Sequence, residues 1–125
     1  MGYPFNQIPP QAWVNAGGGY GQATLCGTLG VAAACIGMVC EADQGKKVLY
    51  ELNEWYKTAQ FPMYQPEGLD LPQTVANSLL CEDSVNIYMD ESGHEYGSAE
   101  RKSRCAGVAA DVTRKLVELL NAELA

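Results

Sequence analysis

Cysteine is the residue type in this chain with the most chemical reactivity, and it occurs five times. The five are Cys26, Cys35, Cys40, Cys81 and Cys105. A thiolate binds metals and attacks disulfides, and a helix N-terminus favours the thiolate form through its free N–H groups and its dipole. The chain contains no CxxC and no CxxCH sequence, so thioredoxin-like chemistry and c-type haem attachment are not predicted.

Three of the cysteines lie in one uncharged stretch, GGGYGQATLCGTLGVAAACIGMVC, residues 17–40. Its glycines suit a tight turn, and the residues from Gln22 onward predict a helix with Cys26 in its first turn. Counted at 3.6 residues per turn, Cys40 lies on roughly the face of Cys26 but about 20 Å away, whereas Cys35 lies on the opposite face. One helix therefore cannot bring two of these sulfurs to one metal, and Cys35 is interpreted as a small buried apolar residue.

The same glycines raise the question of phosphate binding, because a glycine turn before a helix is an anion site. The stretch lacks a G-x-G-x-x-G sequence after a strand, and no P-loop lysine follows it. Nucleotide binding is therefore not predicted.

Three further helices are predicted, and two of them carry the remaining cysteines. They span about residues 45–59, 79–90 and 99–123. Asp43, Ser78 and Ser98 are the expected N-caps of the three helices in turn. Cys81 then falls in a first helical turn, and Cys105 opens the apolar stripe of the last helix and points inward. If these helices pack side by side with the first, Cys26, Cys81 and Cys105 could converge.

No strand pattern or repeat stands out, so we expect an all-α protein, a compact bundle of about four helices. Residues 1–16 contain three prolines between aromatic residues and predict an extended N-terminal arm, laid across the body or a partner. Residues 17–125 form the expected single helical domain. The length of 125 residues and the 47% hydrophobic content fit one folded domain.

Every charged residue follows position 40, and the net charge of −7 argues against nucleic-acid or anionic-membrane partners. The uncharged residues 23–40 are long enough to raise the question of a membrane span. They are rich in Gly, Ala and Thr, and no Lys or Arg precedes them, so a buried core helix is favoured. The chain begins at Met1 without a secretory signal, which predicts a cytoplasmic protein with reduced cysteines.

Four blocks of the sequence, in order, resemble the split-Soret cytochrome family. They are GGGYGQATLCGTLGVAAACIG, ELNEWYKTAQFPMYQP, SLLCEDSV and SAERKSRCAGVAADVTRKLVELLN, and the resemblance covers roughly residues 3–121. Its wider relatives are redox-active proteins named for a C…GCAxxG…C…C cysteine pattern. The resemblance implies an all-α redox protein of anaerobes that is often dimeric. Proteins of that family are often exported, so an exported or periplasmic location is the alternative to a cytoplasmic one. It also implies that the matching residues Cys26, Cys81 and Cys105 hold an iron centre, expected to be an iron–sulfur cluster.

Two departures from that family alter what the resemblance implies. The haem-attachment motifs and histidine ligands of its cytochrome members are missing, and Glu82 stands where they have histidine after the cysteine, so covalent haem is not expected. A Gly-Cys pair found before the first block in the family is also missing. The three matching thiolates then leave a fourth ligand open: Cys40, a carboxylate such as Glu82, a residue of a second subunit, or none.

The sequence therefore predicts a small electron-transfer protein with an iron–sulfur centre, working with a redox partner protein as a homodimer or as a subunit of a complex. The alternative is a non-catalytic helical subunit of a larger redox complex, with structural cysteines. A thiol enzyme using Cys26 as nucleophile ranks last, because His94 is the only histidine and no base is well placed. Whether the protein is an enzyme stays open, with electron transfer preferred.

Overall fold

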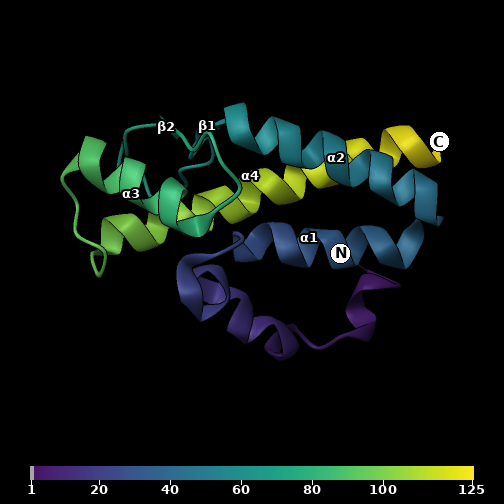
Figure 1. Cartoon of the computed structure of the whole chain (residues 1–125). Coiled ribbons are helices and arrows are strands. Elements are labelled where there is room, and N and C mark those ends of the chain that lie inside the picture. Colours follow the sequence, from purple (N-terminus) through teal and green to yellow (C-terminus); the bar gives the residue numbers. More distant parts are fainter. Residues whose placement is uncertain (1) are drawn as a thin grey trace.

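Four α-helices make up most of the regular structure in the computed structural model, which describes residues 2–125 (Figure 1). The helices are α1 (Gly27–Val39), α2 (Ala42–Thr58), α3 (Cys81–Ser92) and α4 (Ala99–Leu124). They confirm the predicted all-α bundle. Met1, the first residue of the predicted arm, lies outside the described residues. None of the described helices combines the length and the apolarity needed to cross a bilayer.

Side-chain caps explain where two of these helices begin. Ser98 caps α4 as predicted, because its Oγ accepts a hydrogen bond from the Arg101 N–H at 3.1 Å. The predicted cap Asp43 is wrong: Glu41 caps α2 in a reciprocal capping box with Gln44. Ser78 is also wrong as the cap of α3, because its Oγ accepts from the Leu80 N–H at 3.0 Å, one residue before the helix begins.

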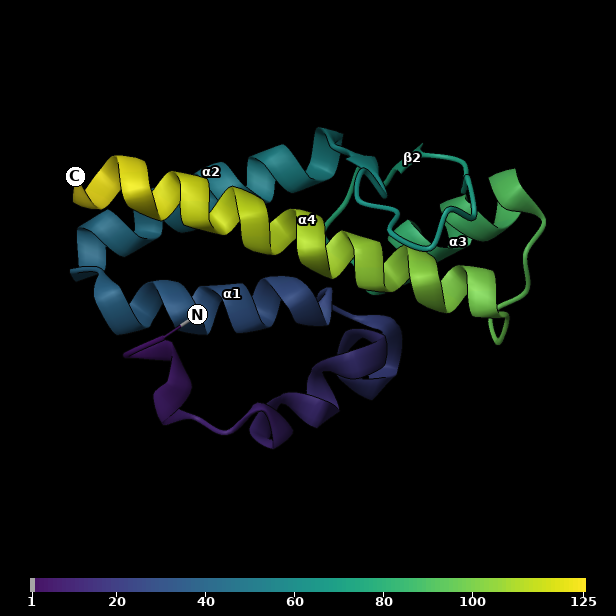
Figure 2. The same ribbon diagram turned by 180° about the vertical axis from the view of Figure 1, so that it is seen from behind.

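The N-terminal segment runs along the outer side of α1 in both views (Figures 1 and 2). It contains two short 3₁₀ helices that its prolines did not reveal, η1 (Phe5–Gln7) and η2 (Pro10–Ala16). Ala16 at the end of η2 is buried against the start of α1, where a Cβ on Gly27 would overlap the Ala16 carbonyl group. The segment thus packs on the body of its own chain.

A compact turn, η3 (Gly19–Ala23), separates the arm from α1. Several of its residues have positive φ, and Tyr20 and Ala23 do so without being glycine, with φ of 59° and 56°. The predicted helix start at Gln22 is therefore wrong, because a left-handed residue at Ala23 stops any helix there. The helix begins only at Gly27.

The core lies between α1, α2 and α4, while α3 packs against the first half of α4 and against β2 (Figure 2). Its fully buried apolar residues include Leu29, Ile36, Leu52 and Val112. Two short strands, β1 (Gln60–Phe61) and β2 (Thr74–Val75), pair antiparallel in the connection between α2 and α3. The expectation of no strands is wrong to that extent, because two residues are too few to show an alternating pattern.

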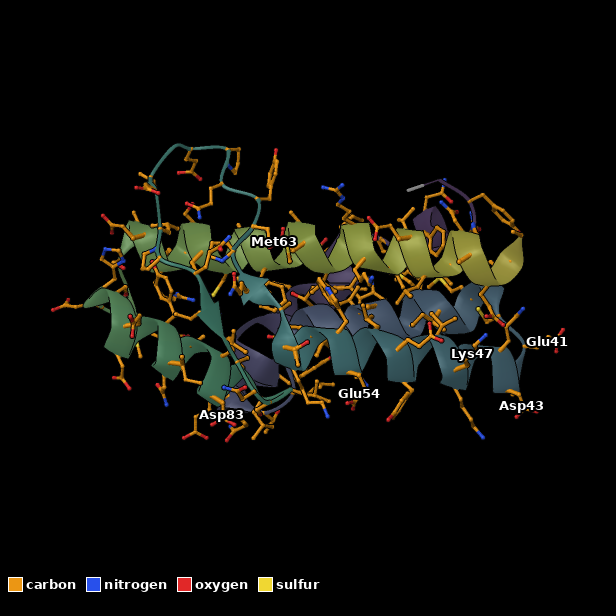
Figure 3. All side chains as sticks on the ribbon, turned by 90° about the horizontal axis from the view of Figure 1, so that it is seen from above. Glu41, Asp43, Lys47, Glu54, Met63 and Asp83 are labelled. Carbon is orange, nitrogen blue, oxygen red and sulfur yellow. The ribbon has the colours of Figure 1, made fainter. Side chains whose placement is uncertain are left out.

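The connection between the strands is anchored on α4. Asp111 is 7% exposed, and its carboxylate accepts hydrogen bonds from the backbone N–H groups of Met63 at 2.7 Å and Tyr64 at 3.1 Å. Figure 3 shows Met63 beside α4. Asp111 is thus a charged residue on a covered face of α4, where its carboxylate binds backbone N–H groups.

Candidate functional site

A cavity of about 470 Å³ lies where the glycine turn and the helices α1, α3 and α4 meet. Cys26, Cys81 and Cys105, from three different helices or helix starts, all line it. The structure therefore brings together the three cysteines that the sequence selected. Most of the remaining wall is apolar and includes Val31, Val108 and Val112.

Cys26 and Cys81 are held side by side by their backbones. Leu25 and Leu80, the residues before them, form an isolated antiparallel β-bridge. The Cys26 N–H donates to the Leu79 carbonyl oxygen at 2.9 Å, and the Cys81 N–H donates to the Thr24 carbonyl oxygen at 2.6 Å. Since side chains alternate between the faces of paired strands, the two cysteines share one face.

Both cysteines also lie at helix starts. Cys81 lies in the first turn of α3, as predicted, although the helix begins at Cys81 and not at Leu79. Cys26 precedes α1 as its N-cap and does not lie in its first turn. The first N–H groups of a helix have no partner within the helix, and they carry the positive end of its dipole. Two helix N-termini therefore face the region of these sulfurs.

Gly19 closes the turn tightly against α3. Its φ is +60°, and a Cβ built on it would lie 2.7 Å from the Cβ of Cys81. Only glycine fits this position, both for its backbone conformation and for its contact with Cys81.

Cys105 lies on the side of the cavity where the charged side chains are. The guanidinium groups of Arg101 and Arg104 on α4 lie 3.7 Å and 3.8 Å from its sulfur, each through Nη1. Arg101 also stacks on the exposed ring of Tyr96, 4.2 Å from the ring centroid, and its Nε donates to the Tyr96 carbonyl oxygen. Cys105 therefore faces two permanent positive charges.

A chain of polar groups continues behind the cysteines. The Nη2 of Arg104 donates to the Oγ of Ser84 at 2.8 Å, and the hydroxyl of Tyr56 donates to the same oxygen at 3.5 Å. Burial raises the pKa of the Tyr56 phenol, and the neighbouring Cys26 raises it further. Tyr56 therefore stays protonated and can donate a hydrogen bond toward the cavity.

The thiol of Cys81 shows how closely the three cysteines interact. Burial raises its pKa most, and charge on Cys26 and Cys105 raises the pKa again, while Arg101 and Arg104 lower it. The cysteines therefore resist joint deprotonation unless positive charge compensates them. The two arginines supply part of that charge.

Cys35 lines the same cavity, which corrects the prediction that it lies opposite Cys26. The prediction counted one continuous helix through both residues, but Cys26 precedes α1 with non-helical backbone angles, φ −53° and ψ 124°. Within α1, Thr28, Val31 and Cys35 share one face at helical spacing. Burial raises the pKa of the Cys35 thiol. Cys40, the fourth-ligand candidate on this stretch, is not among the residues that line the cavity.

The cavity is not a preformed site for a single ion. Within residues 2–125, no three His, Cys, Asp or Glu side chains stand close enough together to hold one metal ion. The thiols surround a space instead of meeting at a point.

Sequence reasoning did not select Tyr56, Ser84 or Arg104 as residues of the site. A signal existed for Arg104, because it precedes the buried residues Val108, Val112, Leu116 and Leu120 at intervals of four on one helix face. Tyr56 and Ser84 carried no comparable signal, since each reaches the cavity through the packing of separate helices.

The bundle and its cavity together define a class: all-α proteins that gather cysteine thiols from separate helices into one internal space. The family model described as "Putative redox-active protein (C_GCAxxG_C_C)" matches residues 2–119. The chain belongs to this family.

Split-Soret cytochrome c of Desulfovibrio desulfuricans is 32% identical to the chain over 130 aligned positions, which cover 98% of this chain and 47% of that protein. A solved structure, described as "A novel iron centre in the split-Soret cytochrome c from Desulfovibrio desulfuricans ATCC 27774", matches with a TM-score of 0.90 and 30% identity. The match covers 99% of this chain and 55% of that one. The chain thus spans about half the length of this relative, with the same helical fold.

Proposed function

We propose that the protein is an electron-transfer protein that binds an iron–sulfur centre through Cys26, Cys81 and Cys105. The observation that carries the proposal is the convergence of these three thiols on one cavity of about 470 Å³. Thiolates are the usual protein ligands of iron–sulfur centres. The iron centre named for the D. desulfuricans structure, which shares this fold, supports the proposal.

The residues present fit such a group. The cavity offers four thiols, those of the three proposed ligands and of Cys35, together with two helix N-termini and two guanidinium groups, and its described lining contains no carboxylate. The Nε of Arg104 is buried and has no hydrogen-bond partner, so the site has an unused donor. Thiols that surround a space and do not meet at a point suit a centre of more than one iron.

When bound, an iron–sulfur centre supplies reversible one-electron chemistry. The chain's own residues would hold it, exclude water from it and bias its charge. Val31, Val108 and Val112 form an apolar wall, and a low-dielectric wall strengthens the charge interactions inside the cavity. The protein would work with a separate redox partner, as an oligomer or as a subunit of a complex, and we propose a cytoplasmic location for it.

The decisive experiment measures iron and acid-labile sulfide in anaerobically purified protein, together with its visible spectrum. We expect iron with matching sulfide in the wild type, and loss of both in Cys26→Ser, Cys81→Ser and Cys105→Ser. Cys40→Ser is the matched control, because this cysteine lies outside the cavity and should keep the centre. Folded wild-type protein without iron or sulfide would refute the proposal and favour a structural subunit of a redox complex.

A further inference from the structure

Arg104 is a buried charge whose hydrogen bonding is incomplete. It is 2% exposed, donates from Nη2 to Ser84 and approaches the Cys105 sulfur through Nη1. Its guanidinium carbon lies 5.3 Å from the ring centroid of Tyr88. Its Nε is buried without any hydrogen-bond partner. An arginine keeps its charge in proteins, so this guanidinium is a cation that the fold has removed from water.

Within residues 2–125, no carboxylate forms a salt bridge with that cation. The salt bridges found within residues 2–125 involve Lys47, Lys57, Arg114 and Lys115, and none involves Arg104. The other buried charged residue, Asp111, accepts hydrogen bonds from the backbone of the connection between β1 and β2. Among the described residues that line the cavity, Arg101 and Arg104 are the charged ones. A buried charge without a partner costs several kcal/mol, so an anion in the cavity is needed to offset it.

We propose that Arg104 is the counter-charge for the anionic group held in this cavity, and that it thereby sets the charge state which that group prefers. This inference rests on the proposed function for the nature of the group, an iron–sulfur centre with thiolate ligands. A fixed cation beside the Cys105 ligand favours the more negative, reduced state. Arg101 is half-exposed, so water screens its charge, and Arg104 has the larger effect.

The test compares Arg104→Met, which removes the charge and keeps most of the length, with Arg104→Lys, which keeps a charge. Arg114→Met is the matched control on the same helix, because the side chain of Arg114 is 84% exposed and is not among the residues that line the cavity. The first readout is the unfolding temperature of each iron-free protein. We expect Arg104→Met to be at least as stable as the iron-free wild type, because the charge it removes has no partner there.

The second readout is the midpoint potential of the iron-loaded proteins, titrated with dithionite. Each dithionite ion takes oxygen from two water molecules, becomes two sulfite ions and releases two electrons and four protons; each electron taken up would convert one Fe(III) to Fe(II) and add one negative charge to the cavity. We expect Arg104→Met to shift the reduction equilibrium about tenfold toward the oxidised state, equivalent to about 59 mV for one electron. Arg104→Lys should shift it less, and Arg114→Met should leave it unchanged.

The two proposals can fail separately. Wild-type protein that takes up no iron and sulfide refutes the proposed function, and the iron-free unfolding temperatures still decide the role of Arg104. If Arg104→Met destabilises the iron-free protein, Arg104 is a packing residue and the inference is overturned. An unchanged midpoint potential in loaded Arg104→Met overturns it as well.

Discussion

Leu25 and Leu80 pair across an isolated antiparallel bridge, and the residue after each of them is a cysteine of the cavity. Backbone hydrogen bonds donated by Cys26 and Cys81 close this bridge on both sides. Two segments far apart in the sequence thus meet at a fixed register. The relative position of these sulfurs is set by main-chain geometry before any ligand binds.

Substitution of Gly19 tests how far that geometry depends on the glycine turn. Gly19→Ala adds a methyl group 2.7 Å from the Cβ of Cys81, at a φ of +60°. We expect a loss of about 2–4 kcal/mol in the free energy of unfolding, from left-handed strain and overlap together, and lower iron content. Gly21→Ala is the control, because its φ is +75° but no atom lies within 4 Å of the added group. It should lose only about 1–2 kcal/mol. Equal losses in urea unfolding would show that contact with Cys81 is unimportant.

The alkylation of Cys81 in iron-free protein should depend on Cys26. Burial and the two neighbouring cysteines raise the Cys81 pKa, so less thiolate is present at a given pH and alkylation is slow near neutrality. Cys26→Ser removes one of the groups that raise this pKa. We therefore expect the rate of Cys81 alkylation by iodoacetamide, followed by peptide mass spectrometry, to rise at lower pH in this variant. Cys40→Ser should leave the pH dependence of Cys81 alkylation unchanged. An unchanged pH dependence in Cys26→Ser would show that the thiols of Cys26 and Cys81 do not interact.

Asp111 anchors the connection between β1 and β2, so its loss should destabilise the fold without a direct contact to the cavity. Asp111→Ala leaves the N–H groups of Met63 and Tyr64 without their acceptor. We expect a loss of about 2–4 kcal/mol in urea unfolding, and a smaller loss for Asp111→Asn, which keeps one acceptor oxygen. Arg114→Ala, on the exposed face of the same helix, should change stability by about 0.5 kcal/mol or less. If Asp111→Ala lost no more unfolding free energy than Arg114→Ala, the anchoring role of Asp111 would be contradicted.

Two helical glycines should respond in opposite directions to alanine. Gly107 on α4 is buried, and an added Cβ would lie 2.7 Å from the Cβ of Pro62 and from the Tyr64 carbonyl oxygen, so we expect a loss of about 1–3 kcal/mol. Gly37 on α1 is exposed with no atom within 4 Å, so Gly37→Ala should gain about 0.5–1 kcal/mol from helix propensity. Thermal unfolding of both variants checks the pair, and a stabilised Gly107→Ala would show that α4 and Pro62 are less closely packed.

The helices could be predicted from the sequence because they depend on local patterns, whereas the grouping of the three cysteines followed from the family resemblance and from the assumption that the helices pack side by side. Ser98 is a capping residue directly before an apolar stripe, and Cys105 lies on that stripe, so its inward direction followed. Cys81 also lies in a first turn as predicted, although Ser78, the expected cap, does not cap α3.

The errors arose where tertiary packing overrides local preference. Tyr20 and Ala23 adopt left-handed conformations that their residue types disfavour, which moved the start of α1 and with it the direction of Cys35. Asp111 looks like a surface residue until the β1–β2 connection covers it. The left-handed turn and the covering of Asp111 both depend on contacts with residues more than one helical turn away in the sequence.

The charge around the cavity is entirely one-sided. The wall built from residues 16–35 has no ionisable side chain apart from its thiols, whereas Arg101 and Arg104 both belong to α4. The charged side chains of the cavity therefore come from a single helix, while the opposite wall contributes thiols and the N-terminus of α1. Substitutions within one turn of α4 would therefore change the side-chain charge of the cavity and leave the residues of the opposite wall in place.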